Sequence, residues 1–403
     1  MKPCCTAALV RGLCVDLTGK PQTVVFQKWE GEVCHASALK LETDSAGSEE
    51  DAAALIRGAY ETWKKSNAAD GKTLLPSCAA LTANGKVEAV FWIGNDIDSA
   101  RKRLAEKDDS PRFETPAVTG DVISTEERAD VVKNRVAIVT GGAQGIGEEI
   151  VRNLAAAGAL VFIADLNLEG AQKLADEINS GEGRTAALAL EVNVSSEEST
   201  AAMFETVALT TGGFDLCISN AGVLKAGSVL EQELSDFKFV TDINYTGFFL
   251  ISKYAGRLLR TQHCTAPKWK TDIIQVNSKS GLEGSNKNGA YAGGKFGGLG
   301  LVASFAMELV EYGVKVNAVC PGNFLDGPLW SHPEKGLFVQ YLRTGKVPGA
   351  KSIADVRTFY ESKVPMKRGC TGKDLVRAIY YIVEQQYETG QAVPVTGGQV
   401  MLH

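Results

Sequence analysis

From about residue 130 onward, the sequence alternates between short apolar runs of strand length and longer helical stretches. The runs are Val136–Thr140, Leu160–Ala164, Thr185–Leu190, Phe214–Ser219, Asp272–Val276 and Val314–Val319. Alternation of this kind is typical of a parallel sheet with helices on both faces. Strands buried on both sides also explain continuously apolar runs such as VAIVT. We therefore predict a doubly wound α/β fold of the Rossmann type.

The first of these strands runs directly into a glycine-rich turn, TGGAQGIG, that a helix follows. Glycines allow a tight turn and a close approach of the backbone to a diphosphate, which the free N–H groups at the helix start can bind. A purely structural strand–helix turn is the alternative, but its place in the first strand–helix–strand unit favours a dinucleotide site. The predicted cofactor-binding residues of this turn are Gly141, Gln144, Gly145, Ile146 and Gly147.

Polar and small residues at the ends of later strands extend this predicted cofactor site. Asp165 ends the second strand, where a carboxylate can accept hydrogen bonds from the adenosine ribose and repel a 2′-phosphate. No lysine or arginine neighbours it, so NAD is predicted rather than NADP; a helix-capping aspartate is the alternative. The other predicted contacts are Asn193 and Val194 near the adenine, and Asn220, Ala221 and Gly222 after the fourth strand.

The segment Tyr291-Ala292-Gly293-Gly294-Lys295 carries the clearest chemical signal, because residues four apart share one helix face. A tyrosine pKa of about 10 is too high for an efficient base near neutral pH. The Lys295 ammonium and a positive nicotinamide ring are expected to lower the pKa of Tyr291. Lys295 can also hold the nicotinamide ribose. Ser278, which follows the fifth strand, is expected to orient the substrate oxygen, and Asn244 to hold a water that relays protons to Lys295.

Seven features of the sequence, taken in order, resemble the motifs of the short-chain dehydrogenase/reductase family. They are TGGAQGIG, Asp165, NAG at 220–222, Asn244, Ser278, YAGGK at 291–295 and CPGN at 320–323. The resemblance covers about 270 residues and implies hydride transfer with NAD at a Tyr–Lys–Ser–Asn site. It adds Pro321 and Gly322 as cofactor contacts. It also implies a homotetramer that pairs helices spanning Thr246–Leu259 and Tyr291–Glu311. Asn193 departs from the family's pattern, because the family usually has an aspartate at this position. The difference affects contact with the adenine.

Three segments are similar to the corresponding segments of the family's hexitol-phosphate dehydrogenases. They are NSKSG at 277–281, KVPMKRGC at 363–370 and VTGGQVM near the C-terminus. This implies interconversion of sorbitol 6-phosphate and fructose 6-phosphate, with Ser278, Lys279 and Tyr291 contacting the substrate. A phosphate needs cations beside the nicotinamide pocket. Beyond Lys279, the candidates are Arg343, Lys346, Lys351, Arg357, Lys363, Lys367 and Arg368. An unphosphorylated polyol or other secondary alcohol is the alternative substrate, and a redox-inert cofactor sensor is a more remote one.

Residues 1–110 are predicted to form a small α/β domain, with a linker at 111–131 and the dehydrogenase domain at 132–403. Within the small domain, Ala7–Asp16 and Thr23–Trp29 are predicted as strands joined in a hairpin-like connection. Ser48–Ser66 is predicted as an amphipathic helix, Val87–Ile93 as a strand, and Asp98–Glu106 as a helix capped by Asp98. An assembly module, a regulatory domain and, least favoured, a second active site remain open as its role.

The net charge of −6 and the pI near 5.5 argue against a nucleic-acid partner. No apolar run reaches the length that a membrane helix needs, and no membrane partner is expected. With four histidines and no Cys-x-x-Cys among nine cysteines, neither a metal site nor a disulfide framework is predicted. A small-molecule substrate and a cytoplasmic location are therefore expected.

Overall fold

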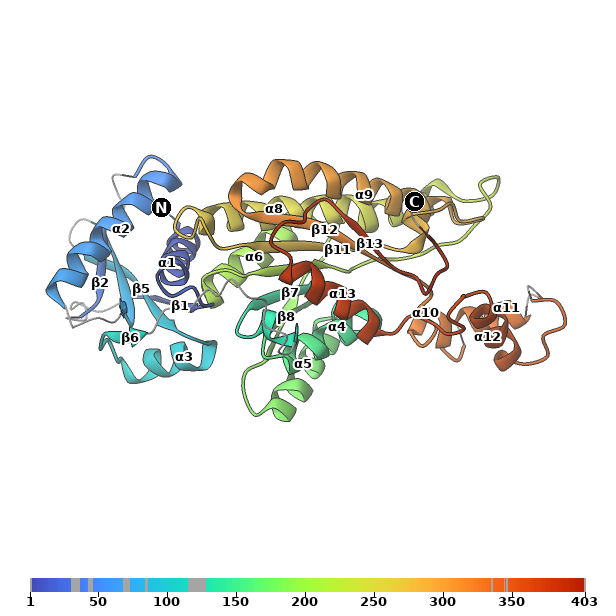
Figure 1. The fold of residues 1–403 in the computed structure, drawn as a ribbon, viewed down its shortest axis with the longest axis horizontal. Helices are drawn as coiled ribbons and strands as arrows, with labels where there is room; N and C mark the ends of the chain where they lie inside the picture. The colour runs from blue at the N-terminus through green and yellow to red at the C-terminus, as the bar shows by residue number, and fades with distance from the viewer. Residues whose placement is uncertain are drawn as a thin grey trace.

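The computed structural model describes residues 2–29, 37–42, 46–67, 73–83, 86–114, 128–334, 336–343, 345 and 347–401. Residues 115–127, which make up most of the predicted linker, lie outside this description. A seven-stranded parallel sheet with the order β13-β12-β11-β10-β7-β8-β9 forms the body of the protein (Figure 1). Its strands are β7 Val136–Thr140, β8 Leu160–Asp165, β9 Ala187–Glu191, β10 Leu216–Ser219, β11 Thr271–Val276, β12 Val314–Pro321 and β13 Ala392–Val395. The predicted doubly wound α/β fold is therefore confirmed.

Helices cover both faces of this sheet and bury its apolar side chains in two separate cores. One core holds α4 Gly145–Ala156, α5 Leu168–Glu182 and α13 Gly372–Glu384. The other holds α6 Glu197–Thr211, α8 Gly247–His263 and α9 Gly289–Leu309. Because the inner strands of the sheet are buried on both sides, runs such as VAIVT contain no exposed residue. Shorter elements are α7 Leu234–Thr241, η1 Arg128–Val132, η2 Asp242–Thr246, η3 Lys279–Gly281 and η4 Val310–Tyr312.

A small helical lobe follows β12 and projects from one end of the sheet (Figure 1). It consists of α10 Pro328–Ser331, α11 Leu337–Arg343 and α12 Ile353–Ser362. Trp330 forms the centre of its own apolar cluster, with ring centroids 5.2 Å from Phe338 and 4.8 Å from Tyr360. A self-contained aromatic core explains how this long insertion holds its shape away from the main sheet.

The N-terminal unit is built around a second, four-stranded sheet with the order β1-β5-β4-β2. Its elements are α1 Pro3–Thr18, β1 Thr23–Lys28, β2 Leu39–Glu42, α2 Glu49–Ser66, β3 Thr73–Leu75, β4 Cys78–Ala83, β5 Lys86–Gly94, α3 Ile97–Glu106 and β6 Arg112–Glu114. The short strand β6 lies within the range predicted as linker and pairs with β3. Helix α2 and strand β5 match the predicted helix and strand closely.

Two predictions in this unit are wrong. Ala7–Asp16 is not a strand but part of helix α1, so no hairpin joins it to β1, which pairs instead with β5. The helix is buried almost all round, and this removes the polar face by which an amphipathic helix is recognised. In addition, Asp96 rather than Asp98 caps α3, in a capping box with Ser99.

Helix α1 attaches the N-terminal unit to the amino ends of the dehydrogenase strands. Arg11 Nη2 lies 2.8 Å from Asp215 Oδ2, and both side chains are fully buried. The same carboxylate oxygen accepts a hydrogen bond from Val136 N at 2.8 Å, at the start of β7. Asp98 does not cap α3 as predicted. Its carboxylate instead accepts hydrogen bonds from Thr185 N and Oγ1. The N-terminal unit and the α10–α12 lobe thus lie at opposite ends of the sheet (Figure 1).

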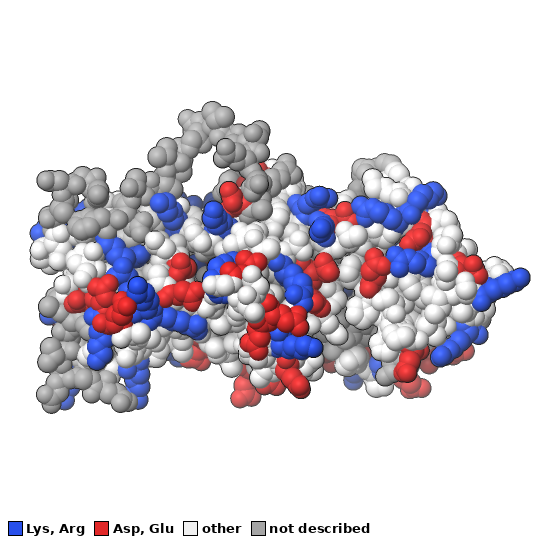
Figure 2. Space-filling view, turned by 90° about the horizontal axis from the view of Figure 1, so that it is seen from below, with Lys and Arg blue, Asp and Glu red and all other residues white. Residues whose placement is uncertain are grey.

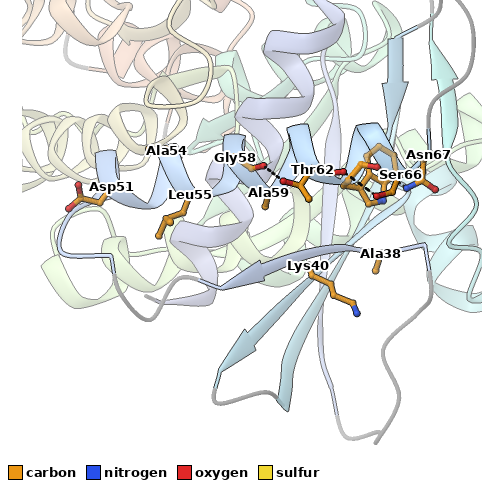
Figure 3. A pocket seen from close by; sticks show the side chains of 11 residues that line it. Ala38, Lys40, Asp51, Ala54, Leu55, Gly58, Ala59, Thr62, Ser66 and Asn67 are labelled. Atoms are coloured by element: carbon orange, nitrogen blue, oxygen red, sulfur yellow. Dashed lines mark hydrogen bonds between the residues drawn. The ribbon is translucent and has the colours of Figure 1, made fainter.

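A groove of about 960 Å³ lies between α2 and β2 in the N-terminal unit (Figure 3). Leu55, Gly58 and Thr62 line it from the helix and Lys40 from the strand. None of the predicted dehydrogenase residues lines this groove. It is therefore a feature of the N-terminal unit alone.

Figure 2 shows the distribution of charged side chains on one face of the protein. On the face drawn in Figure 2, basic and acidic side chains are interspersed across the described residues. Among those residues, no helix combines the length and apolar character that crossing a bilayer requires.

Candidate active site

The glycine-rich turn lies between β7 and α4 at the carboxyl edge of the sheet, and its backbone favours glycine at several positions. Gly141 has φ +62°, in the left-handed region that favours glycine. A Cβ on Gly147 would lie 2.0 Å from the Gly141 carbonyl oxygen, which no side chain could relieve. No side chain caps the start of α4, where Gln144 occupies the N-cap position. Backbone N–H groups at this end of the helix suit a diphosphate, so the turn fits the predicted dinucleotide.

Asp165 lies beside this turn at the end of β8. Its Oδ2 accepts a hydrogen bond from Ala143 N at 3.0 Å, and its Oδ1 accepts one from Asn167 N at 3.0 Å. The cap of helix α5 is Asn167, whose side chain accepts from Gly170 N. The alternative reading of Asp165 as a helix cap therefore fails, and its carboxylate is oriented by the turn itself.

Asn220 joins the end of β10 to the same turn. Its Nδ2 donates to the carbonyl oxygens of Thr140 at 3.0 Å and Gly141 at 2.9 Å. Thr140 was not among the predicted residues, yet its buried Oγ1 accepts hydrogen bonds from the N–H groups of Asn220 and Ala221. A polar residue closing an apolar strand is the sequence signal that could have identified it.

The remaining predicted cofactor residues occupy structural positions whose ligand contacts stay predictions. Asn193 is exposed, and its Oδ1 accepts from Ser195 N at 3.1 Å, as in a local turn. Val194 packs against the start of α8, where a Cβ on Gly247 would lie 3.2 Å from it. Gly322, which follows Pro321 at the end of β12, donates its N–H to Val395 O at 3.0 Å.

Tyr291 and Lys295 lie on one face of α9, close to Ser278 at the end of β11. The Lys295 ammonium is 5.6 Å from the centroid of the Tyr291 ring. Its Nζ donates to the carbonyl oxygen of Val276 at 2.8 Å, and only 5% of the lysine is exposed. Tyr291 and Ser278 share a side-chain hydrogen bond. The structure thus brings together Tyr291, Lys295 and Ser278, three of the four predicted catalytic residues.

The predicted lowering of the tyrosine pKa depends in part on a bound nicotinamide and stays a prediction, and in the protein alone the pKa shift has the opposite direction. Burial raises the pKa of Tyr291 above its ordinary value, and the hydrogen bond with Ser278 only partly opposes this. Burial also lowers the pKa of Lys295 to about 8. The lysine is bound to Val276 rather than to the phenol, so its charge does not outweigh the burial of the ring.

Asn244 lies in the π-helical turn η2, and π-turns are frequent at functional sites. Its side-chain amide is not directed at Lys295. Instead its Oδ1 accepts from Val223 N and its Nδ2 donates to Val223 O, both at 2.8 Å. The amide fixes the chain that follows Asn220-Ala221-Gly222. The predicted proton relay from Asn244 to Lys295 stays a prediction.

The predicted phosphate-binding cations do not converge on the site in this structure. Lys279 follows Ser278 directly, and its Nζ lies 3.3 Å from Glu283 Oε1. Arg357 pairs with Asp326 and Glu361, and Arg368 pairs with Asp374. Arg343, Lys351, Lys363 and Lys367 are exposed, whereas Lys346 lies outside the described residues. Lys279 is therefore the cation whose position in the chain best matches the prediction.

A glycine turn suited to a diphosphate, together with a tyrosine–lysine pair whose lysine is buried, defines an oxidoreductase that uses a nicotinamide dinucleotide. The family model described as short chain dehydrogenase matches residues 135–332. Sorbitol-6-phosphate 2-dehydrogenase of Escherichia coli K12 is 36% identical over 271 residues, which cover 66% of this chain and 99% of that protein. The chain belongs to the short-chain dehydrogenase/reductase family.

Other relatives agree with this assignment. The crystal structure of sorbitol-6-phosphate 2-dehydrogenase from Erwinia amylovora superimposes with a TM-score of 0.61 at 38% identity, covering 66% of this chain and all of that one. Meso-2,3-butanediol dehydrogenase of Serratia marcescens is 29% identical over 255 residues, or 60% of this chain and 96% of that protein. The matched share leaves out about a third of this chain, so these relatives do not account for the N-terminal unit.

Proposed function

We propose that this protein interconverts a hexitol phosphate and a ketose phosphate, sorbitol 6-phosphate and fructose 6-phosphate, with NAD as the hydride carrier. The similarity at 36–38% identity to two sorbitol-6-phosphate dehydrogenases, over 99–100% of their lengths, carries the proposal. The similarity of NSKSG around the catalytic serine, noted above, supports it at the site.

In this proposal the residues of the chain bind and orient the substrate and move its proton, and a bound nicotinamide would supply the hydride acceptor. Tyr291 removes the hydroxyl proton of the substrate, or returns it to the carbonyl in the reverse direction. Ser278, hydrogen-bonded to Tyr291, holds the same substrate oxygen. Lys295, with a pKa lowered to about 8, holds the ribose and exchanges a proton with Tyr291.

The choice of NAD is supported by Asp165. Its carboxylate is held beside the glycine turn by two backbone N–H groups, so it cannot easily turn away from the ribose of a bound dinucleotide. A 2′-phosphate at the same place would meet a fixed negative charge. No lysine or arginine occurs in the adjacent segment 164–167 that could offset this repulsion.

A phosphate preference depends on Lys279 exchanging partners. Its ion pair with Glu283 is partly solvated, with side-chain exposures of 26% and 46%. Pairs of this kind contribute only about 0–1 kcal/mol. A phosphate dianion forms stronger charge-assisted hydrogen bonds, each of roughly 1.5–3 kcal/mol. A sugar phosphate could therefore displace Glu283 at little cost.

We expect kcat/KM for sorbitol 6-phosphate to exceed that for sorbitol by about 10²- to 10⁴-fold, as two charge-assisted bonds would give. Turnover of phosphorylated and free polyols with NAD, and then with NADP, measures this directly. Lys279→Met should remove much of the preference while sparing free sorbitol. Lys173→Met, an exposed lysine on α5, is the control. Equal kcat/KM for both polyols would reject the phosphate and favour the alternative below.

The alternative substrate is an unphosphorylated secondary alcohol. Two observations favour it: the similarity to meso-2,3-butanediol dehydrogenase, and the pairing of Arg357 and Arg368 with carboxylates of the chain. The same panel of substrates distinguishes the two proposals, because only a phosphorylated substrate depends on Lys279.

We also propose a homotetramer in the cytoplasm. The faces of α8 and α9 expose large apolar side chains, with Phe249 41%, Phe296 47% and Met307 78% exposed. Exposed apolar patches on paired helices are typical of subunit interfaces. Light scattering at micromolar concentration should give the mass of four chains, and a monomer would contradict it.

A further inference from the structure

Asn277 connects the two elements that carry the proposed catalytic residues. It lies between the end of β11 and Ser278, with 3% of the residue exposed. Its Oδ1 accepts a hydrogen bond from Ser278 N at 2.8 Å, and its Nδ2 donates to the carbonyl oxygen of Lys295 at 2.9 Å. One buried amide therefore binds the backbone of the serine on one side and the backbone of the lysine on the other.

The surroundings leave this amide little freedom. Its Nδ2 also donates to Gln275 Oε1 at 2.7 Å, and its own N–H donates to Val319 O at 2.8 Å. A Cβ on Gly281 would lie only 2.1 Å from Asn277 Oδ1, so the turn that carries Ser278 folds directly onto the amide. The side-chain hydrogen bonds use both polar atoms of the amide, and each bond lies in a buried, water-poor region, where it holds its geometry firmly.

We propose that Asn277 is a positioning residue that sets the distance between Ser278 and Tyr291. This inference rests on the proposed function, because it assigns Ser278 and Tyr291 their roles in proton transfer. Tyr291 lies one helical turn before Lys295, so fixing the lysine backbone fixes the start of α9. Fixing Ser278 N at the same time holds the serine hydroxyl against the tyrosine. A displacement of about 1 Å in such a pair can lower a rate by roughly 10²-fold.

The chain offers a matched control in Asn179. Its side chain also joins a helix to a strand by three hydrogen bonds, accepting from Ala186 N and Ala187 N and donating to Ala187 O. It lies in α5, in the core on the other side of the sheet from α9. Removing either amide should destabilise the protein, but only Asn277 should affect the chemistry.

The test compares Asn277→Ala, Asn179→Ala, Ser278→Ala and the double variant Asn277→Ala/Ser278→Ala in the full chain. Asn277→Ala should lower kcat on the order of 10-fold, with the KM for NAD within about twofold of wild type. Loss of the Ser278 hydrogen bond should also move the pKa seen in the rising limb of the pH–kcat/KM profile for alcohol oxidation upward, since that bond lowers the pKa of Tyr291. In the Ser278→Ala background, Asn277→Ala should lower kcat by a clearly smaller factor than in the wild type, because the part of its effect that acts through the serine is already lost.

Three outcomes decide the question. If Asn277→Ala keeps kcat within twofold of wild type, or lowers it by the same factor with and without Ser278, the positioning role is overturned. If Ser278→Ala itself leaves kcat unchanged, the proposed function fails first. Should Asn277→Ala not fold, Asn277→Asp replaces it, because the carboxylate keeps the acceptor for Ser278 N but loses the donor to Lys295; the same fall in kcat is expected.

Discussion

Tyr291→Phe is expected to lower kcat by at least about 10²-fold, the lower range for general acid–base groups, and to leave NAD affinity nearly unchanged. The substitution removes only the phenolic oxygen, which shares a hydrogen bond with Ser278, and keeps the ring that packs near Lys295. Steady-state kinetics with the best polyol of the substrate panel, together with NAD titration by fluorescence, measures both quantities.

The pH dependence gives an independent check on Tyr291. Burial raises the pKa of Tyr291, so the phenolate that acts as base in alcohol oxidation becomes more populated as the pH rises. The wild-type kcat/KM for oxidation should therefore increase with pH, and the phenylalanine variant should lack that increase. Tyr381→Phe, which removes a hydroxyl bonded to Glu388, is the control and should retain full activity. Turnover of Tyr291→Phe within about threefold of wild type would show that another group is the base.

Arg11→Met is expected to destabilise the whole protein by about 3–5 kcal/mol, the usual effect of removing one partner of a buried ion pair. Although burial alone would raise it, the charges of Arg11 and Arg135 hold the pKa of Asp215 below its ordinary value. Without Arg11, the Asp215 carboxylate stays fully buried at the start of β10 with one fewer cation. Chemical denaturation monitored by fluorescence measures the change in the free energy of unfolding.

The sign of the pH effect identifies the mechanism of this destabilisation. In the wild type the lowered pKa of Asp215 contributes stability above its unfolded pKa, and this is lost as the pH falls through the folded value. In Arg11→Met the folded pKa should rise, so the variant should be least stable at high pH and recover towards pH 5. Arg11→Met/Asp215→Asn should restore most of the stability, because the neutral amide still accepts from Val136 N.

The matched control for Arg11 is Arg152→Met, which breaks a partly solvated pair with Glu148 and Glu177 and should cost no more than about 1 kcal/mol. If Arg11→Met costs no more than this control, the buried pair does not join the two units. Deletion of residues 1–120 would test whether the N-terminal unit has an assembly role, but the Arg11–Asp215 pair affects how the result is interpreted. Such a truncation removes Arg11 together with the unit, so a loss of folding would not by itself reveal that role.

The central strands of the fold could be predicted because their sequences have a single physical explanation. Runs such as VAIVT are long enough, apolar enough and regularly enough spaced that only a parallel sheet buries them. Helix α1 could not be predicted in this way, since its outer faces are covered by other parts of the protein. Two local signals did mark it: Pro3 at its first turn and Gly19, with φ +63°, after its end. Strand β13 was missed because it is a short edge strand that contains Pro394.

The candidate site divides in the same way. Residues whose identity is dictated by backbone geometry or by proton transfer, such as Gly147 and Tyr291, form patterns that can be read directly. The partners that hold them in place, Thr140 and Asn277, are ordinary polar residues at strand ends, and their role depends on contacts with elements far away in sequence. The direction of the Tyr291 pKa shift likewise depends on burial, which spacing along the chain does not reveal.

The ion pair between Arg11 and Asp215 joins residues 204 positions apart, and this separation sets an order of events during synthesis. At roughly 5–20 residues per second, a ribosome needs about 10–40 s after completing α1 to deliver its partner. During this time Arg11 and the apolar side of α1 that packs on α6 and α8 have no place to bind. The N-terminal unit therefore completes its folding only after half of the dehydrogenase domain has emerged. A nascent chain halted before residue 215 should expose this helix to proteases and chaperones, and one halted well beyond it should not.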